Sequence, residues 1–131
     1  MRIVIAALGL AALFAVHLSQ AATSGPAIAR VWHGRVPAAK ADDYAKYLTD
    51  SIKKFRTIPG NRGYQMMRED TGAEAHFMVI SFWSSRDAIH GYAGADISKV
   101  RSLPRDGEFL TDPEATVRNY DLVVDDLQRP S

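Results

Sequence analysis

The sequence predicts an α+β domain of the ferredoxin-like type, in which a four-stranded antiparallel sheet carries both helices on one face. Two observations indicate this fold. Periods of two and of 3.6 residues alternate along the chain in the order strand, helix, strand, strand, helix, strand. The third predicted strand is also apolar on both of its faces, which is typical of a sheet that is covered on both sides.

The first half of the domain is predicted to form a strand followed by a long helix. Residues 29–36 are rich in Val, Trp and Arg, and Pro37 stops the strand. A helix is expected from about residue 38 to 56, because large apolar side chains recur there at the spacing of one buried face: Tyr44, Tyr47, Leu48, Ile52 and Phe55. The helix should end at Ile58-Pro59-Gly60, since a residue before proline avoids helical angles.

The second half repeats the pattern after a hairpin. Strands are expected over residues 63–69 and 75–83, joined by a loop at residues 70–74. Ser84-Ser85-Arg86-Asp87 has a capping-box pattern and should open a second helix that ends near Gly94. Residues 95–113 are less periodic, with a short helix expected around 105–110. Residues 116–124 form the last predicted strand.

The third predicted strand gives an expectation about assembly. Phe77, Val79 and Trp83 alternate with Met78, Ile80 and Phe82, so that both faces are apolar. The helices can cover one face. In a chain of this length the other face should pack on a second subunit or line a cavity, and we expect a homodimer.

The N-terminal residues predict export. Arg2 is followed by an apolar run over residues 3–16 and then by Ser19-Gln20-Ala21, the order of a secretory signal peptide. Cleavage after Ala21 would release the protein to the periplasm or medium without a stable membrane anchor; an uncleaved anchor is the alternative. The chain then divides into a signal peptide (1–21), a leader (22–27), one domain (28–124) and a polar tail (125–131).

Composition excludes several classes of function. The formal net charge is only +1, which argues against a nucleic-acid partner, because such binding needs concentrated positive charge. The absence of Cys excludes disulfides, iron–sulfur clusters and thiolate metal sites. The histidines have no metal-ligand spacing. Arg30, Arg62 and Arg68 are expected to be solvated or to lie at an edge.

Several segments together resemble a known family. They are Ile58-Pro59-Gly60-Asn61-Arg62-Gly63, Ile80-Ser81-Phe82-Trp83-Ser84-Ser85 and Asn119-Tyr120-Asp121-Leu122. From about residue 28 to 124 the chain resembles the antibiotic biosynthesis monooxygenase domain family of the dimeric α+β barrels. The resemblance implies a homodimer with a cavity in each subunit between helices and sheet. That family includes cofactor-free quinone-forming monooxygenases and haem-degrading enzymes.

Five residues are candidates for the site. The resemblance implies that Trp83 lines the cavity, although a Trp packed in the core is the alternative. His33 and His90 are candidate proton acceptors, since histidine titrates near neutrality; His33 as a structural side chain and His90 as a surface one are the alternatives. Trp32 and Tyr92 are expected to contact the substrate.

The chain also departs from the pattern of the family. Val79 stands where quinone-forming relatives carry Asn, and Asn119 stands where many relatives carry His. The haem-degrading relatives need an Asn on the first strand, which here offers His33 instead. The leading hypothesis is an exported oxygenase that oxidises a phenol or hydroquinone with O₂ and no cofactor. The alternatives are a non-catalytic dimeric barrel that binds a small aromatic or apolar ligand and, third, a protein that binds or degrades haem.

Overall fold

The computed structural model describes residues 25–131, so the predicted signal peptide and most of the leader lie outside the described residues. Four strands and two helices follow the predicted order: β1 (Ile28–Pro37), α1 (Ala41–Ile52), β2 (Asn61–Asp70), β3 (Glu74–Trp83), α2 (Arg86–Ala93) and β4 (Arg118–Asp121). Short 3₁₀ turns at Ala38–Lys40 and Lys53–Thr57 flank α1, and a third lies at Asp106–Glu108.

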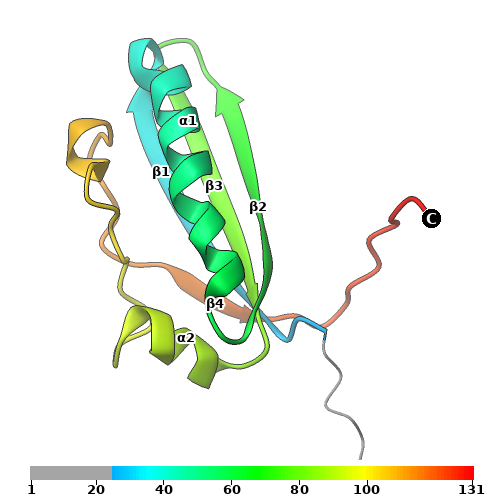
Figure 1. The fold of residues 1–131 in the computed structure, drawn as a ribbon. Coiled ribbons are helices and arrows are strands. Elements are labelled where there is room, and N and C mark those ends of the chain that lie inside the picture. The colour runs from blue at the N-terminus through cyan, green and yellow to red at the C-terminus, as the bar shows by residue number, and fades with distance from the viewer. Residues whose placement is uncertain (1–24) are drawn as a thin grey trace, which may run out of the picture.

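The strands form one antiparallel sheet in the order β2-β3-β1-β4. Helix α1 lies along one face of the sheet, and α2 lies beside one end of it (Figure 1). This arrangement confirms the predicted ferredoxin-like α+β fold. In the central pair of strands, Trp32 lies opposite Val79 and Arg30 lies opposite Ser81, so that all four side chains share the face under α1.

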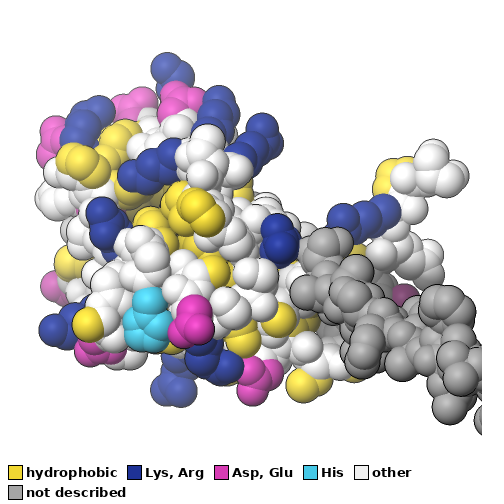
Figure 2. All heavy atoms as spheres, turned by 60° about the horizontal axis from the view of Figure 1, so that its bottom comes forward, with side chains coloured by type: hydrophobic (Ala, Val, Ile, Leu, Met, Phe, Trp, Pro, Cys, Tyr) yellow, Lys and Arg dark blue, Asp and Glu magenta, His cyan; other side chains and the backbone are white. Residues whose placement is uncertain are grey.

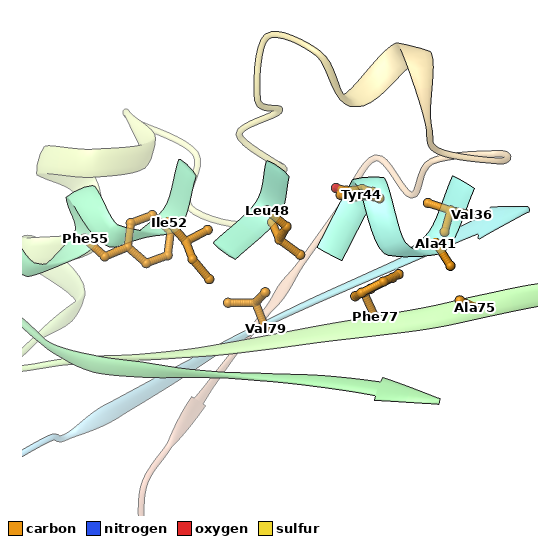
Figure 3. Close-up of a cluster of buried hydrophobic side chains, with 9 residues drawn as sticks. All are labelled: Val36, Ala41, Tyr44, Leu48, Ile52, Phe55, Ala75, Phe77 and Val79. Atoms are coloured by element: carbon orange, nitrogen blue, oxygen red, sulfur yellow. The ribbon is translucent and has the colours of Figure 1, made fainter. Parts of the chain in front are cut away.

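The main core lies between α1 and that face of the sheet. Side chains of α1 point down onto Phe77 and Val79 of β3 (Figure 3). This cluster consists of Val36, Ala41, Tyr44, Leu48, Ile52, Phe55, Ala75, Phe77 and Val79. Trp83 and Ile89 form a second cluster with Ile28 at the start of α2. Helix α2 begins where predicted, with Ser85 as its N-cap: the Ser85 hydroxyl accepts a hydrogen bond of 3.1 Å from the Ala88 N–H. The predicted capping box is not formed, because the third residue after Ser85 is Ala88 and not an acid.

The last strand is shorter than predicted. Thr116 forms a bridge with Lys99, and the Val117 N–H donates to the Ser98 carbonyl at 2.7 Å. The beginning of the predicted strand therefore pairs with a returning loop, and only residues 118–121 pair with β1. The strand ends near Leu122 because its partner β1 begins at Ile28. Residues 122–131 extend away from the domain (Figure 1).

The two helices leave the other face of the sheet open. On β3 this outer face carries Met78, Ile80 and Phe82, all half-buried. Met67 on β2 and Tyr120 on β4 lie on the same face and are 42% and 50% exposed. A band of large apolar side chains is thus partly open to solvent. Among residues 25–131, no helix has the length and apolar character needed to cross a membrane.

Candidate active site

A cavity of about 50 Å³ lies between α1 and the sheet. Its apolar wall comes from α1 and the turn after it, from the facing strands β1 and β3, and from the residue before β4: Leu48, Ile52, Phe55, Trp32, Val79 and Val117. Its polar wall consists of Arg30, Ser81, Tyr92, Arg101 and Asp106. A few polar groups in an apolar hollow are typical of a small-molecule site, in which shape provides affinity and the polar groups fix orientation.

Arg30 is the most unusual residue of this cavity, because its side chain is only 4% exposed. Its Nη2 donates to the Lys99 carbonyl at 2.8 Å, and its Nη1 donates to Asn119 Oδ1 at 3.1 Å and to the Ile97 carbonyl. All three acceptors are neutral. Burial lowers the pKa of Arg30, while the nearby Tyr92 opposes this change. A guanidinium stays protonated under ordinary conditions, so a buried positive charge lines the cavity.

Tyr92 forms the wall between this cavity and the surface. Its ring stacks on Trp83 with centroids 5.6 Å apart and meets Phe55 edge-on at 5.2 Å. On its outer side, Arg101 donates to the Tyr92 carbonyl at 2.7 Å and lies 5.4 Å from the ring centroid. Burial raises the pKa of Tyr92, Asp106 adds to the rise, and Arg30 and Arg101 oppose it. Tyr92 is therefore a neutral phenol at physiological pH.

A second hollow lies directly outside this wall. It measures about 270 Å³ and shares Tyr92 and Arg101 with the inner cavity. Seen from the α2 end, hydrophobic side chains gather in the middle of the molecule with Lys and Arg side chains around them (Figure 2).

The Asp106 side chain holds in place the loop that closes the cavity. Its carboxylate accepts a hydrogen bond from the Tyr44 hydroxyl at 2.9 Å and another from the Leu103 N–H at 2.8 Å. Both side chains are buried, Asp106 at 6% exposed and Tyr44 at 0%. Burial raises the pKa of Tyr44, and the adjacent Asp106 carboxylate raises it further. Both carboxylate oxygens of Asp106 are thus engaged in structural hydrogen bonds.

Gly34 allows Trp32 to take its place in the wall. A Cβ atom on Gly34 would lie 2.5 Å from Trp32 Cη2 and 2.7 Å from Cζ2, closer than any two such carbons can approach. The missing side chain of Gly34 leaves the space over β1 in which the indole lies. Position 34 therefore determines how far Trp32 reaches into the cavity.

The structure brings together three of the five sequence-predicted residues. Trp32 and Tyr92 line the cavity. Trp83 lies behind Tyr92, fully buried, with its indole N–H donating to Ser81 Oγ at 2.9 Å, so it supports the wall without lining it.

The two predicted histidines lie apart from the cavity. His33 follows Trp32 on β1 and therefore points to the outer face of the sheet. There its Nδ1 lies 3.5 Å from Glu114 Oε1, and its ring lies 5.5 Å from that of His76. His90 is exposed on α2, with its Nδ1 2.9 Å from the Gly94 carbonyl oxygen. Neither imidazole can exchange a proton directly with a molecule in the cavity of its own subunit.

Four polar residues of the cavity were not among the predicted site residues: Arg30, Ser81, Arg101 and Asp106. Arg30 was expected to be solvated or at an edge, and its burial corrects that expectation. Alternation places residues 28, 30, 32 and 34 on one face of a strand, but it does not show which face lies under the helix. Asp106 has no comparable signal, since its partner Tyr44 lies 62 positions away in the sequence.

The residues of this cavity do not fit a haem group. The cavity of about 50 Å³ is smaller than the ~150 Å³ of an apolar cavity that admits benzene, so it must open for any ring, and the fit to haem is decided by the groups that line it. Neither His33 nor His90 lines it, so no described imidazole is placed to ligate iron there. The lining residues therefore do not support a haem-dependent reaction in this cavity.

Fold and cavity together define a small α+β domain with a cavity between one helix and its sheet. The chain belongs to the antibiotic biosynthesis monooxygenase family, whose profile matches residues 28–99. No curated protein matches the chain significantly.

Solved structures share the fold at low sequence identity. A protein of unknown function from Nitrosomonas europaea has a TM-score of 0.60 and 10% identity, and the match covers 80% of this chain and 97% of that one. A protein from Bacillus cereus described as an antibiotic biosynthesis monooxygenase has a TM-score of 0.56 and 9% identity, with 79% and 100% covered. The haem-degrader MhuD from Mycobacterium tuberculosis, with two haems bound in its active site, has a TM-score of 0.53 and 22% identity, with 75% and 97% covered.

Proposed function

We propose that this protein is a small oxygenase that oxidises an electron-rich phenol or hydroquinone with O₂ and without a cofactor. The observation that carries the proposal is the cavity between α1 and the sheet. It has aromatic walls from Trp32, Phe55 and Tyr92 and a small number of polar groups. Once opened toward the outer hollow, such a cavity would stack a single ring, each aromatic contact contributing about 0.5–1.5 kcal/mol beyond its buried area. Membership of the family supports the reaction class.

The reaction needs no added reductant because the substrate supplies the electrons. A phenol that becomes a quinone takes one oxygen atom from O₂, and the other leaves as water. A hydroquinone that becomes a quinone gives two electrons and two protons to O₂, which leaves as hydrogen peroxide. The role of the protein is to orient the ring, exclude water and favour the deprotonated form, which is the better electron donor.

Substrate entry requires the cavity to open. Its volume of about 50 Å³ is too small for a substituted ring, whereas the hollow outside Tyr92 measures about 270 Å³. Arg101 lies between the two spaces and its side chain is exposed, so it can move without unfolding the domain. We take displacement of Arg101 as the opening step.

Oxygen uptake tests the proposal. Purified protein without residues 1–21 is mixed with a panel of phenols and hydroquinones, and consumption of O₂ and quinone absorbance are followed. Tyr92→Leu should lower affinity or rate about tenfold, the effect of losing roughly 1.4 kcal/mol of ring contact. His33→Gln is the control, since His33 lies on the outer face. Loss of turnover in His33→Gln would assign the base to that face and contradict the site described above.

A non-catalytic role is the second candidate. Specific observations favour it: Val79 lines the cavity as an apolar residue, and both oxygens of Asp106 are already engaged, so the cavity offers no free base. In this case the protein stores or carries a small aromatic molecule. The same screen separates the two functions, because a binding protein would take up ligands and consume no O₂ with any of them.

We further propose that the protein acts as a homodimer joined through the outer face of the sheet. The half-buried Met78, Ile80 and Phe82 and the exposed Met67 and Tyr120 form an apolar band that a monomer would leave in water. Light scattering at micromolar concentration should give the mass of a dimer, and Met78→Lys should give a monomer. Asp50→Lys, on the exposed side of α1, is the control. A monomeric wild-type protein would contradict this assembly.

Export remains a proposal that rests on the first 21 residues. Arg2, the apolar run over residues 3–16 and Ser19-Gln20-Ala21 support cleavage after Ala21 and a periplasmic or secreted protein. Intact mass of protein from its native host should correspond to a chain that begins at Ala22. A full-length cytoplasmic product would contradict it.

A further inference from the structure

We infer that the cavity takes its ligand as an aromatic oxyanion, a phenolate in preference to a carboxylate, with the charged oxygen on the guanidinium of Arg30. This inference rests on the proposed function, because it assumes that an aromatic ring enters the cavity. Beyond the proposed function, it specifies the charge of the ligand and names Arg30 as the residue that recognises this charge.

The buried charge of Arg30 has no counter-ion within the described residues. Charged side chains that are fully buried are normally paired, because an unpaired charge loses its hydration without compensation. The ion pairs among residues 25–131 lie elsewhere, mostly on the surface, and none includes Arg30. Its partners are two carbonyls and an amide oxygen. The guanidinium is therefore held in place without being neutralised.

Asp106, the acid that lines the same cavity, does not neutralise Arg30. Its two oxygens accept hydrogen bonds from Tyr44 and from the Leu103 N–H, which direct them toward α1 and the closing loop. Arg30 and Asp106 form no ion pair. The positive charge of Arg30 is thus left for a ligand.

Arg30 also has more N–H donors than its protein partners use. A guanidinium has five N–H groups in a fixed planar fork. Three of them are used by the Ile97 carbonyl, the Lys99 carbonyl and Asn119 Oδ1. Two remain for an oxyanion, and charge-assisted hydrogen bonds of this kind are about twice as strong as neutral ones. Because β1 and these three contacts fix the side chain, little conformational freedom is lost when an anion binds.

The residues around Arg30 determine which chemical group can accompany the oxyanion. Trp32, Phe55 and Leu48 form the apolar wall of the same cavity, which favours a ring over an inorganic anion. Arg101 at the outer side of Tyr92 adds a second positive charge on the route inward, which attracts anions during entry. A phenolate fits better than a carboxylate because one oxygen attached directly to the ring requires less depth in a small cavity.

Two probes of equal ring size test the inference. 4-Nitrophenol is colourless as the phenol and yellow as the phenolate, and nitrobenzene is its neutral counterpart. Equilibrium dialysis measures their affinities, and absorbance of the bound 4-nitrophenol gives its ionisation state. We expect 4-nitrophenol to bind roughly ten- to a hundredfold more tightly than nitrobenzene, the factor that one or two charge-assisted hydrogen bonds supply. The bound form should be yellow at pH values where the free probe is still partly colourless.

Variants assign the effect to Arg30. Arg30→Gln should bring the two affinities to within about threefold of one another, whereas Arg62→Gln, on the exposed side of β2, should change neither. Arg30→Lys keeps the charge without the fork and should retain part of the preference, and circular dichroism checks that each variant is folded. If Arg30→Gln does not fold, the colour of 4-nitrophenol bound to the wild-type protein still shows whether the ligand binds as a phenolate.

Each outcome has a separate meaning. Equal affinities for nitrobenzene and 4-nitrophenol, or a colourless bound probe, would overturn the inference and leave the proposed aromatic site standing. Failure of both probes to bind would contradict the proposed function itself. Tighter binding of 4-nitrobenzoate than of 4-nitrophenol would overturn the choice of a phenolate.

Discussion

Replacing Tyr44 by Phe removes a single hydroxyl from the interior of the domain. That hydroxyl donates a 2.9 Å hydrogen bond to Asp106 Oδ1, and both side chains are buried. The ring itself packs on Phe77 and Phe109, with centroids 5.3 Å and 5.2 Å away, and a Phe ring keeps these contacts. The substitution therefore changes one interaction and leaves a carboxylate oxygen without its donor.

The expected loss of stability follows from the buried Asp106 oxygen that no longer has a hydrogen-bond donor. A hydrogen bond to a charged group contributes about 1.5–3 kcal/mol, and a buried carboxylate that loses its donor is at the upper part of this range. Asp106 keeps only the Leu103 N–H on its other oxygen. For a domain of about 100 residues, a loss of ~2 kcal/mol lowers Tm by roughly 8–16 °C.

Tyr47→Phe is the matched control. The Tyr47 hydroxyl accepts a 2.9 Å hydrogen bond from the Arg105 N–H at an exposed position, where water can replace it. Its removal should cost less than about 0.5 kcal/mol. Both variants are compared by urea unfolding and calorimetry. If Tyr44→Phe costs no more than Tyr47→Phe, the buried Tyr44–Asp106 pair does not stabilise the closing loop, and the reasoning is refuted.

Three further predictions concern the pH dependence of stability, the space around Trp32 and the binding of haemin. The contribution of Tyr44 and Tyr92 to stability should be constant up to about pH 10 and fall above it, because burial raises the pKa of both side chains in the folded state, whereas the unfolded tyrosines ionise near their ordinary pKa of 10.0. Alkaline unfolding should show this fall, at up to ~1.4 kcal/mol per pH unit for each tyrosine, and Tyr44→Phe should make it shallower. Gly34→Ala should push Trp32 into the cavity, cost about 1–3 kcal/mol of stability and weaken nitrobenzene binding, whereas Gly107→Ala, which has open space at its Cβ, should do neither. Titration with haemin should give no sharp Soret shift that depends on His90, and stoichiometric binding lost in His90→Ala would contradict this.

The fold could be predicted because the information is local. The alternation along residues 75–83 and the helical stripe from Tyr44 to Phe55 depend only on neighbouring residues, and both elements lie where they were expected. The length of the last strand could not be predicted in this way. Thr116 and Val117 have the composition of a strand, but they pair with residues 98–99 in place of β1, and such pairing is set by the whole chain.

The candidate site was predicted only in part for the same reason. Trp32 and Tyr92 were found as aromatic residues of a strand and a helix that meet at the cavity. His33 was grouped with Trp32 although adjacent strand residues point to opposite faces, a rule that was available from the sequence. Arg30 could not be assigned by alternation alone, because each face of β1 carries one arginine, Arg30 inside and Arg35 outside. What distinguishes them is contact with residues 97–119, which only the tertiary structure supplies.

The contacts of Arg30 also link the site to the order in which the chain folds. The residue lies on the first strand, yet its three acceptors belong to residues 67 to 89 positions further along. Contacts of such large sequence separation form late, because the intervening chain must be ordered first. The conformational entropy that this chain loses is offset only once the contacts are made. A nascent or truncated chain that lacks residues 97–119 has the arginine but no site. Ligand binding would therefore report that the whole domain has been synthesised and closed, and a bound ligand would slow proteolysis of the C-terminal half by holding its last strand against the first.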